Sequence, residues 1–134
     1  MKDLLHEKLT ENEISYKIRG AKFDVYNKGG PGLLESAYEA ALAYELSNKH
    51  GFYVKTQVGL PFVYEEISLD IGYRIDIIVE DKVIIEIKSV DELKDVHYKQ
   101  LLTYLKLSNK KLGILVNFNT NKINQSIKRI VNNL

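Results

Sequence analysis

Cysteine is absent from this chain of 134 residues, which excludes disulfide bonds, thiolate metal sites and cysteine nucleophiles. Long apolar stretches are absent too, because no run approaches the roughly 18 residues that cross a membrane. The first residues, MKDLLHEKL, are charged throughout and lack the apolar centre of a signal peptide. We therefore expect a cytoplasmic protein without a membrane partner.

The chain also lacks a strong charge of either sign. Its formal net charge is +1, which counts against tight non-specific binding of nucleic acid by a general basic field. Basic side chains nevertheless gather in the last third of the sequence, at Lys94, Lys99, Lys106, Lys110, Lys111, Lys122, Lys128 and Arg129. They fit a phosphate-facing patch, but solvated helix faces carry such residues routinely, and we favour the solvated interpretation.

Repeats, linkers and low-complexity segments are missing as well, so residues 1–134 are expected to form a single domain. The length suits one domain with a real core and is too short for two ordinary ones. Hydrophobic residues make up 45% of the chain and charged residues 28%, which is typical of soluble globular proteins.

Apolar residues at helical spacing predict helices in the first part of the chain. Residues 2–9 are expected to be a short helical lead-in or a frayed end. Thr10 opens a T-x-x-E capping box, which predicts a helix over residues 11–27. A second helix is expected over residues 33–49, with Gly51 after its last turn.

Strand patterns dominate the middle of the chain and helices return after it. The expected strands cover residues 53–58, 61–64, 67–70, a central pair within 73–90, and the buried run 111–118. A third helix over residues 96–108, capped by Asp91 or Asp95, is expected between the last two of these. Apolar residues at helical spacing predict a final helix marked by Ile123, Ile127, Ile130 and Val131. The predicted fold class is α/β, a layered domain with a mixed central sheet flanked by helices.

The central pair places two carboxylates opposite each other. Residues 80–82 are a polar connection of three residues, which pairs Val79 with Val83. Counting back along the ladder then brings Asp76 directly opposite Glu86. Opposed residues have Cβ atoms roughly 4.5 to 5.5 Å apart, and like charges at that separation are destabilising. The pair therefore needs a cation or a proton.

A hard divalent cation such as Mg²⁺ would balance Asp76 and Glu86, because it takes oxygen ligands and often only one or two carboxylates. Lys88 shares the strand face of Glu86 and would add a fixed positive charge beside the metal. Such a set suits hydrolysis of a phosphodiester. The alternative is a half-exposed hairpin whose Asp, Glu and Lys simply face water, which is the normal pattern of one-sided sheets.

Two further segments accompany this pattern. Asp76, followed ten positions later by Glu86-Ile87-Lys88, resembles the Asp...(Asp/Glu)-x-Lys core of the PD-(D/E)XK nuclease superfamily. Together with GLLESAY at residues 32–38 and QLLTY at residues 100–104, it resembles the GxxExxY family, small bacterial and archaeal proteins placed in that superfamily. The similarity runs from about Leu9 to the C-terminus. Ile75 stands where the superfamily name has a proline, which many members also lack.

The resemblance implies a restriction-endonuclease-like fold with one site formed by Glu35, Asp76, Glu86, Lys88 and Gln100. In that interpretation Asp76, Glu86 and the Ile87 carbonyl bind Mg²⁺, with Mn²⁺ as an alternative. Glu35 completes the metal shell directly or through water. Lys88 activates or positions the attacking water and stabilises developing charge, while Gln100 orients the water or holds a phosphate oxygen.

Several of these side chains also have ordinary structural explanations. Glu35 in the first turn of its helix suits the helix dipole, and Gln100 suits the rim of an apolar helix. Tyr38 is expected to pack beneath Glu35 and donate its hydroxyl. Gln57 could face the site, although a strand Gln is more often exposed, and His97 is a further candidate acid or phosphate ligand.

The expected function is a divalent-metal-dependent nuclease that hydrolyses phosphodiester bonds, with DNA preferred over RNA as the nucleic-acid partner. One alternative is a catalytically inactive nuclease-fold module that binds nucleic acid or a protein. Another is a metal-dependent hydrolase of a small phosphate compound. So small a catalytic core often works as a dimer or within a complex, so a homodimer or a complex subunit is also expected. Sequence specificity is left open because it depends on loop shape and groove contacts.

Overall fold

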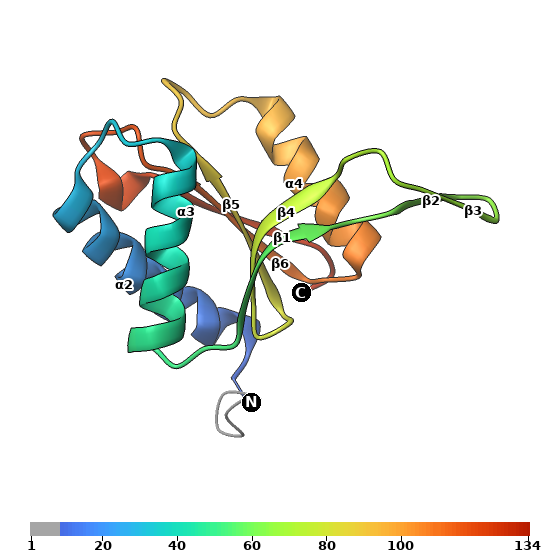
Figure 1. Ribbon diagram of the computed structural model, residues 1–134, viewed down its shortest axis with the longest axis horizontal. Helices are drawn as coiled ribbons and strands as arrows, with labels where there is room; N and C mark the ends of the chain where they lie inside the picture. The colour runs from blue at the N-terminus through green and yellow to red at the C-terminus, as the bar shows by residue number, and fades with distance from the viewer. Residues whose placement is uncertain (1–8) are drawn as a thin grey trace.

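The computed structural model describes residues 9–134, apart from the side chain of Gln125 (Figure 1). The expected lead-in over residues 2–9 therefore lies, but for its last residue, outside the described residues. The elements follow in the order α2 (Glu11–Gly29), α3 (Glu35–Tyr44), η1 (Glu45–Lys49), β1 (Val54–Gly59), β2 (Phe62–Tyr64), β3 (Ile67–Leu69), β4 (Arg74–Val79), β5 (Val83–Lys88), α4 (Asp95–Ser108), β6 (Leu112–Asn117), η2 (Ile123–Gln125) and β7 (Ile127–Val131).

Five strands form the central sheet in the order β1-β4-β5-β6-β7. β1, β4 and β5 are antiparallel neighbours, whereas β5 and β6 run parallel and are joined through α4. β7 then pairs antiparallel with β6 at the far edge. The mixed sheet that the sequence predicts is confirmed.

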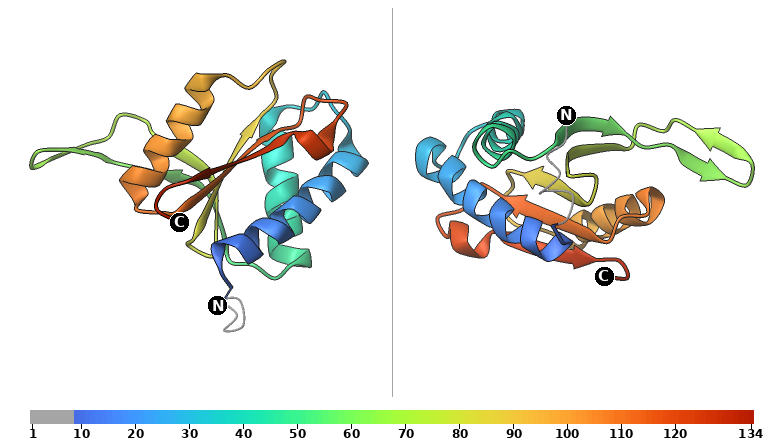
Figure 2. Two further views of the ribbon diagram at one scale, coloured as in Figure 1. Left: turned by 180° about the vertical axis from the view of Figure 1, so that it is seen from behind. Right: turned by 90° about the horizontal axis from the view of Figure 1, so that it is seen from below.

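Helices cover both faces of this sheet. α2 and α3 lie on one side of it and α4 on the other (Figures 1 and 2). Ile85 and Ile87 of β5 belong to the core that includes buried residues of α2 and α3, while Ile84 joins Leu101 and Leu105 of α4. This division follows from the alternation of side chains along a strand. The expected layered α/β arrangement is therefore confirmed.

The first two helices begin and end close to the expected residues. The Thr10 hydroxyl accepts a hydrogen bond of 3.1 Å from the Glu13 amide and so caps α2. The second expected helix is α3 continued by the π-helical turn η1, and Gly51 follows it with a φ of 70°. None of the helices among residues 9–134 is long and apolar enough to cross a membrane.

The final helix expected from the sequence is wrong. Ile127, Ile130 and Val131 belong to the strand β7, and Ile123 belongs to the separate 3₁₀ turn η2. The spacing of these four residues resembles a helical period only when η2 and β7 are read as one continuous element. These residues are β-branched and favour a strand, and pairing covers the otherwise open edge of β6. The sheet thereby gains a strand in place of a covering helix.

The start of α4 also differs from expectation, because neither Asp91 nor Asp95 caps it. Lys94 is the residue at the N-cap, and its amide donates a hydrogen bond of 2.9 Å to Nδ1 of His97. Asp95 is instead the first residue of the helix. The His97 side chain, in the first turn of α4, thus accepts the hydrogen bond of the Lys94 amide at the start of the helix. This contact gives His97 a structural role at the helix start.

The expected hairpin of short strands is confirmed as β2 and β3, which form a separate two-stranded sheet. It turns at Glu65, whose φ is 56°, and projects away from the central sheet (Figure 1). The candidate site lies elsewhere, where β4 and β5 separate.

Candidate active site

The two central strands separate next to the predicted carboxylates. Val79 pairs with Val83, as the length of the connection predicts, and the ladder continues to Ile77 and Ile85. Beyond that pair the described backbone pairing of β4 with β5 stops, one step before Asp76 and Glu86. The register confirms that these two residues face each other at the point where the strands part.

Asp76 and Glu86 bridge this opening with their side chains. Oε2 of Glu86 accepts a hydrogen bond of 2.8 Å from the Asp76 amide. Oδ2 of Asp76 accepts one of 2.9 Å from the Ile87 amide. Each carboxylate therefore accepts a hydrogen bond from a backbone amide of the opposite strand, in place of a bond between two backbone groups. Among the described residues no described hydrogen bond uses Oε1 of Glu86, whereas Oδ1 of Asp76 accepts one of 3.3 Å from Gln57.

The Ile87 carbonyl faces the same opening. Its amide donates to Asp76 of β4, and the amide and carbonyl of one strand residue leave the strand on the same side. The Lys88 carbonyl points the other way and accepts from the Phe118 amide at 2.9 Å. β5 thus offers one backbone oxygen to the carboxylate pair, as the family resemblance implied for Ile87.

Burial makes the paired charges costly. Glu86 is 4% exposed, and its burial, followed by the negative charge of Asp76, raises its pKa to about 8. The hydrogen bond from the Asp76 amide and the positive charge of Lys88 act in the opposite direction without cancelling this rise. Near neutral pH Glu86 therefore holds a proton in the free protein. This is the cation or proton that the sequence argument requires.

Two side chains complete the carboxylate cluster. The Gln57 amide on β1 donates a hydrogen bond of 2.6 Å to Oε1 of Glu39 and one of 3.3 Å to Oδ1 of Asp76. Burial, partly offset by the bond from Gln57, raises the pKa of Glu39, and the charge of Asp76 raises it further. Gln57 has a φ of 52° within β1, an uncommon conformation for a non-glycine residue. Such backbone strain is often found at functional sites.

Glu39 is the residue that the sequence analysis missed. It lies one turn after Glu35 on α3, so the spacing of the helix already contained the signal. Glu35 is exposed at the start of α3, and within residues 9–134 no described hydrogen bond or ion pair joins it to Asp76 or Glu86. The structure therefore brings Glu39 to the carboxylate pair, and the role of Glu35 stays a prediction.

The Tyr38 hydroxyl hydrogen-bonds to the loop before α3 instead of donating to Glu35. Its hydroxyl donates to the Gly30 carbonyl and accepts a hydrogen bond of 3.1 Å from the Leu33 amide. Its ring stacks on Phe118 with centroids 4.2 Å apart and planes inclined by 5°. Because the Phe118 amide bonds the Lys88 carbonyl, Tyr38 links the glycine loop to the end of β5.

α4 contributes aromatic and polar groups on the other side. Burial and the charge of Glu86 raise the pKa of Tyr104, which shows that its hydroxyl lies in the field of the carboxylate. Gln100, one turn earlier, is half-buried, and no described hydrogen bond joins it to Lys88. Lys88 is half-buried at the end of β5. The structure gathers Asp76, Glu86, Ile87 and Lys88, whereas the role of Gln100 stays a prediction.

The donor set fits a hard divalent cation. Carboxylate and carbonyl oxygens are the ligands that Mg²⁺ prefers, and it is often held by one or two carboxylates together with water. The raised pKa of Glu86 reflects its burial and the negative charge of Asp76, both of which a bound cation would offset. Among residues 9–134, however, no three His, Asp or Glu side chains are grouped closely enough to hold a metal by themselves. Water or substrate oxygens would have to complete the shell.

Comparisons with known proteins agree with this geometry. The family model described as the PD-(D/E)XK nuclease superfamily matches residues 12–130. A solved structure, the crystal structure of SSO0001, is similar with a TM-score of 0.53 and 19% sequence identity, over 90% of this chain and 79% of that one. At this identity the likeness concerns the fold alone. Comparison with curated protein sequences finds no match. The family match and the mixed sheet together confirm a restriction-endonuclease-like fold.

Proposed function

Because the chain belongs to the PD-(D/E)XK nuclease superfamily, we propose that it is a divalent-metal-dependent nuclease that hydrolyses phosphodiester bonds of nucleic acid. Nucleases of this superfamily usually use divalent metals. The observation that carries the proposal is the crossed pair of Asp76 and Glu86, where one acid keeps a proton to a pKa of about 8. The narrower assignment to the GxxExxY family stays a prediction.

Asp76, Glu86 and the Ile87 carbonyl would hold Mg²⁺ or Mn²⁺, and a bound ion of this kind polarises the phosphate and lowers the pKa of a bound water. Glu86 would give up its proton on uptake of the ion, because the cation would replace the proton as counter-charge. Glu39, bonded to Gln57 beside Asp76, would act on the ion through water, because among residues 9–134 no three such acids are grouped closely enough to hold it directly.

Lys88 stabilises the transition state in this proposal. It follows Glu86 by two residues on the same strand face, and its charge already acts on that carboxylate. A fixed ammonium group at this place opposes the negative charge that develops on the phosphate oxygens. The Phe118 amide, bonded to the Lys88 carbonyl, holds the backbone from which this side chain extends.

We propose DNA as the substrate in preference to RNA, and a cytoplasmic location. A second function has an observation of its own in its favour. The carboxylates of Asp76 and Glu86 accept backbone amides and so join β4 to β5. A nuclease fold that has lost activity would keep them for that reason. The second candidate is therefore an inactive module that binds nucleic acid or a protein.

Cleavage of labelled DNA and RNA with Mg²⁺ or Mn²⁺ separates the two functions. We expect Lys88→Ala to reduce the cleavage rate by about a hundredfold or more, as expected for loss of a group that stabilises developing charge. Lys99→Ala, which removes an exposed lysine of α4, serves as the matched control and should retain the wild-type rate. Equal rates for wild type and Lys88→Ala would contradict the assignment, and no cleavage by the wild type would favour the inactive module.

The same assay compares two glutamates one turn apart on α3. Glu39→Gln should lower the rate, because Glu39 is the acid that is bonded to Gln57 beside Asp76. Glu35→Gln provides a control of the same chemistry on the same helix, and a smaller effect is expected there. The opposite order would restore Glu35 to the place that the family resemblance gave it.

A further inference from the structure

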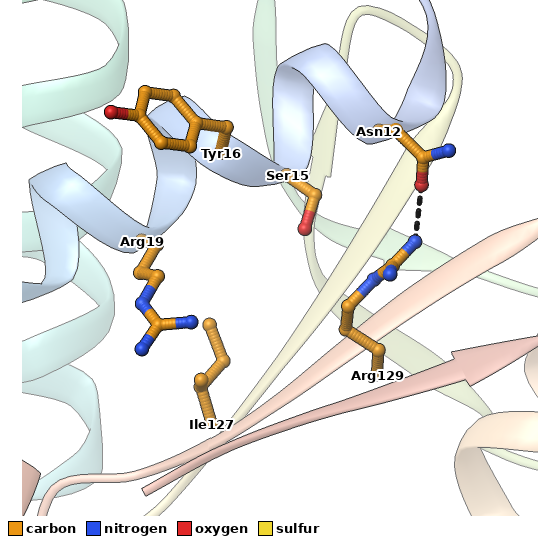
Figure 3. A pocket seen from close by; sticks show the side chains of 6 residues that line it. All are labelled: Asn12, Ser15, Tyr16, Arg19, Ile127 and Arg129. Carbon is orange, nitrogen blue, oxygen red and sulfur yellow. Dashed lines mark hydrogen bonds between the residues drawn. The ribbon is translucent and has the colours of Figure 1, made fainter. Parts of the chain in front are cut away.

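A pocket with two arginines lies apart from the carboxylate cluster. It has a volume of about 220 Å³ and lies between the first half of α2 and the edge strand β7 (Figure 3). Six residues line it: Asn12, Ser15, Tyr16, Arg19, Ile127 and Arg129. β6 separates β7 from β5 in the sheet, so this pocket shares no lining residue with the candidate active site.

Two guanidinium groups reach this pocket from different elements. Arg129 extends from β7 and donates a hydrogen bond to Oδ1 of Asn12 on α2. Arg19 extends from α2, and among the described residues it has no hydrogen bond or ion pair. None of the six lining residues is acidic. The pocket therefore presents two positive charges without a described counter-ion.

A third cation follows Arg19 on the same helix. Lys22 follows Arg19 by one turn, is fully buried, and donates a hydrogen bond of 2.8 Å to the Ile123 carbonyl. Burial, and then the positive charge of Arg19, lowers its pKa to about 8. Arg19 and Lys22 therefore repel each other. An anion between the arginines would relieve this repulsion.

Neutral groups complete a surface suited to a phosphate ester. The Ser15 hydroxyl is directed from α2 into the space between the two guanidinium groups (Figure 3). Ser15 is only 8% exposed, and no described hydrogen bond uses its hydroxyl. The Tyr16 side chain on the rim is 80% exposed, an uncommon exposure for so large an aromatic group. It offers a flat face on which a base can stack.

We propose that this pocket binds the phosphate group of a nucleotide, with Arg19, Arg129 and Ser15 as ligands of the phosphate and Tyr16 as the stacking surface for the base. Arginine favours phosphate because its planar group donates two parallel hydrogen bonds. The nucleotide can come from two sources that share this chemistry, namely a free mononucleotide or a nucleotide within a single strand. The site does not depend on the proposed nuclease activity.

Amide chemical shifts of the full chain, recorded by NMR during titration, test the proposal. The probes are inorganic phosphate, adenosine monophosphate and a short single-stranded oligothymidylate. We expect shifts of the amides of α2 and β7 with all three. Arg19→Gln and Arg129→Gln should each weaken binding by roughly tenfold or more, the effect of one charge-assisted hydrogen bond. Lys128→Gln is the matched control, because it removes the same charge from the neighbouring exposed residue of β7 outside the pocket.

Tyr16→Ala tests whether the base of the nucleotide stacks on the Tyr16 ring. This substitution should weaken the binding of adenosine monophosphate by about fivefold or more and leave the binding of inorganic phosphate unchanged, since stacking acts on the base alone. Tighter binding of the mononucleotide identifies a free ligand, and tighter binding of the oligothymidylate identifies a strand. Either result supports the site.

Three results would overturn the proposal. They are no shift at millimolar concentration of any probe, equal weakening by Lys128→Gln and by the two arginine variants, or identical affinity of adenosine monophosphate with and without Tyr16. Repeating the titration on Asp76→Asn separates this site from the nuclease. Retained binding in that variant supports an independent pocket whatever its effect on cleavage, whereas lost binding would contradict the separation.

Discussion

Glu86 occupies a position that few acids tolerate, buried between strands and opposite a second carboxylate. Its pKa is raised from 4.5 to about 8 by burial and then by Asp76. Between these two values the folded chain binds a proton that the unfolded chain has released. The free energy of unfolding therefore falls as pH rises from 4.5 to about 8, because stability decreases wherever the folded state binds more protons.

Glu86→Gln tests this coupling at a single residue. The amide still accepts a hydrogen bond from the Asp76 backbone and removes the buried charge. Above pH 8 we expect the variant to be more stable than the wild type by about 1 to 3 kcal/mol, with a weaker dependence on pH below it. Urea unfolding at a series of pH values measures both effects. A variant less stable than the wild type above pH 8 would show that the carboxylate is held as an ion.

At the scale of residues, the sequence predicts the pair of Asp76 and Glu86 better than it predicts the residues around that pair. Asp76 and Glu86 face each other because the connection of three residues fixes the register, and that length is visible in the sequence. Glu39 escapes prediction because the position of α3 along its own axis decides whether it or Glu35 lies beside β1. The helical spacing alone does not determine that position, since both residues lie on neighbouring turns of one face.

At the scale of elements, the glycine loop, α3 and the end of β5 are joined by one side chain. The Tyr38 hydroxyl bonds Gly30 and Leu33, and its ring stacks on Phe118, whose amide bonds Lys88. The tyrosine of the GLLESAY segment therefore supports the site without entering it.

Tyr38→Phe should lower the free energy of unfolding by about 1 to 2 kcal/mol, because the part-buried hydrogen bonds of its hydroxyl with the Gly30 carbonyl and the Leu33 amide are lost. Tyr44→Phe makes the same chemical change on the exposed face of α3, where the side chain is 57% exposed, and should change stability by less than about 0.5 kcal/mol. Chemical denaturation followed by circular dichroism measures the two variants. Equal effects would show that the hydroxyl of Tyr38 is not used in this way.

Elements whose residues fit only a strand or only a helix are predicted well from the sequence. Elements whose residues fit both patterns are not. β6 is a continuous apolar run, and its complete burial follows directly. β7 is a short edge strand with one exposed face, so its isoleucines fit a helical period as well as a strand. Its pairing with β6 decides between the two, and that pairing cannot be read from the local spacing of apolar residues within β7.

The whole molecule carries its chemistry in two places on one mixed sheet. The carboxylate cluster lies where β4 and β5 part, and the arginine pocket lies at the β7 edge. The β2–β3 hairpin extends outward from β1 and β4, which it connects, with Val63, Tyr64 and Ile67 exposed (Figure 1). A net charge of +1 hides this separation of charge, because the acidic and basic clusters cancel in the sum.

Calorimetric titration of the protein with Mn²⁺ near neutral pH, in two buffers of different ionisation enthalpy, tests the central claim most directly. We predict uptake of metal with release of a proton from Glu86, because the cation replaces the proton between the carboxylates. Asp76→Asn should abolish this uptake, whereas Asp95→Asn, an exposed acid at the start of α4, should leave it unchanged. No uptake by the wild type, or equal uptake by Asp76→Asn, would contradict a metal-dependent site at this pair of carboxylates.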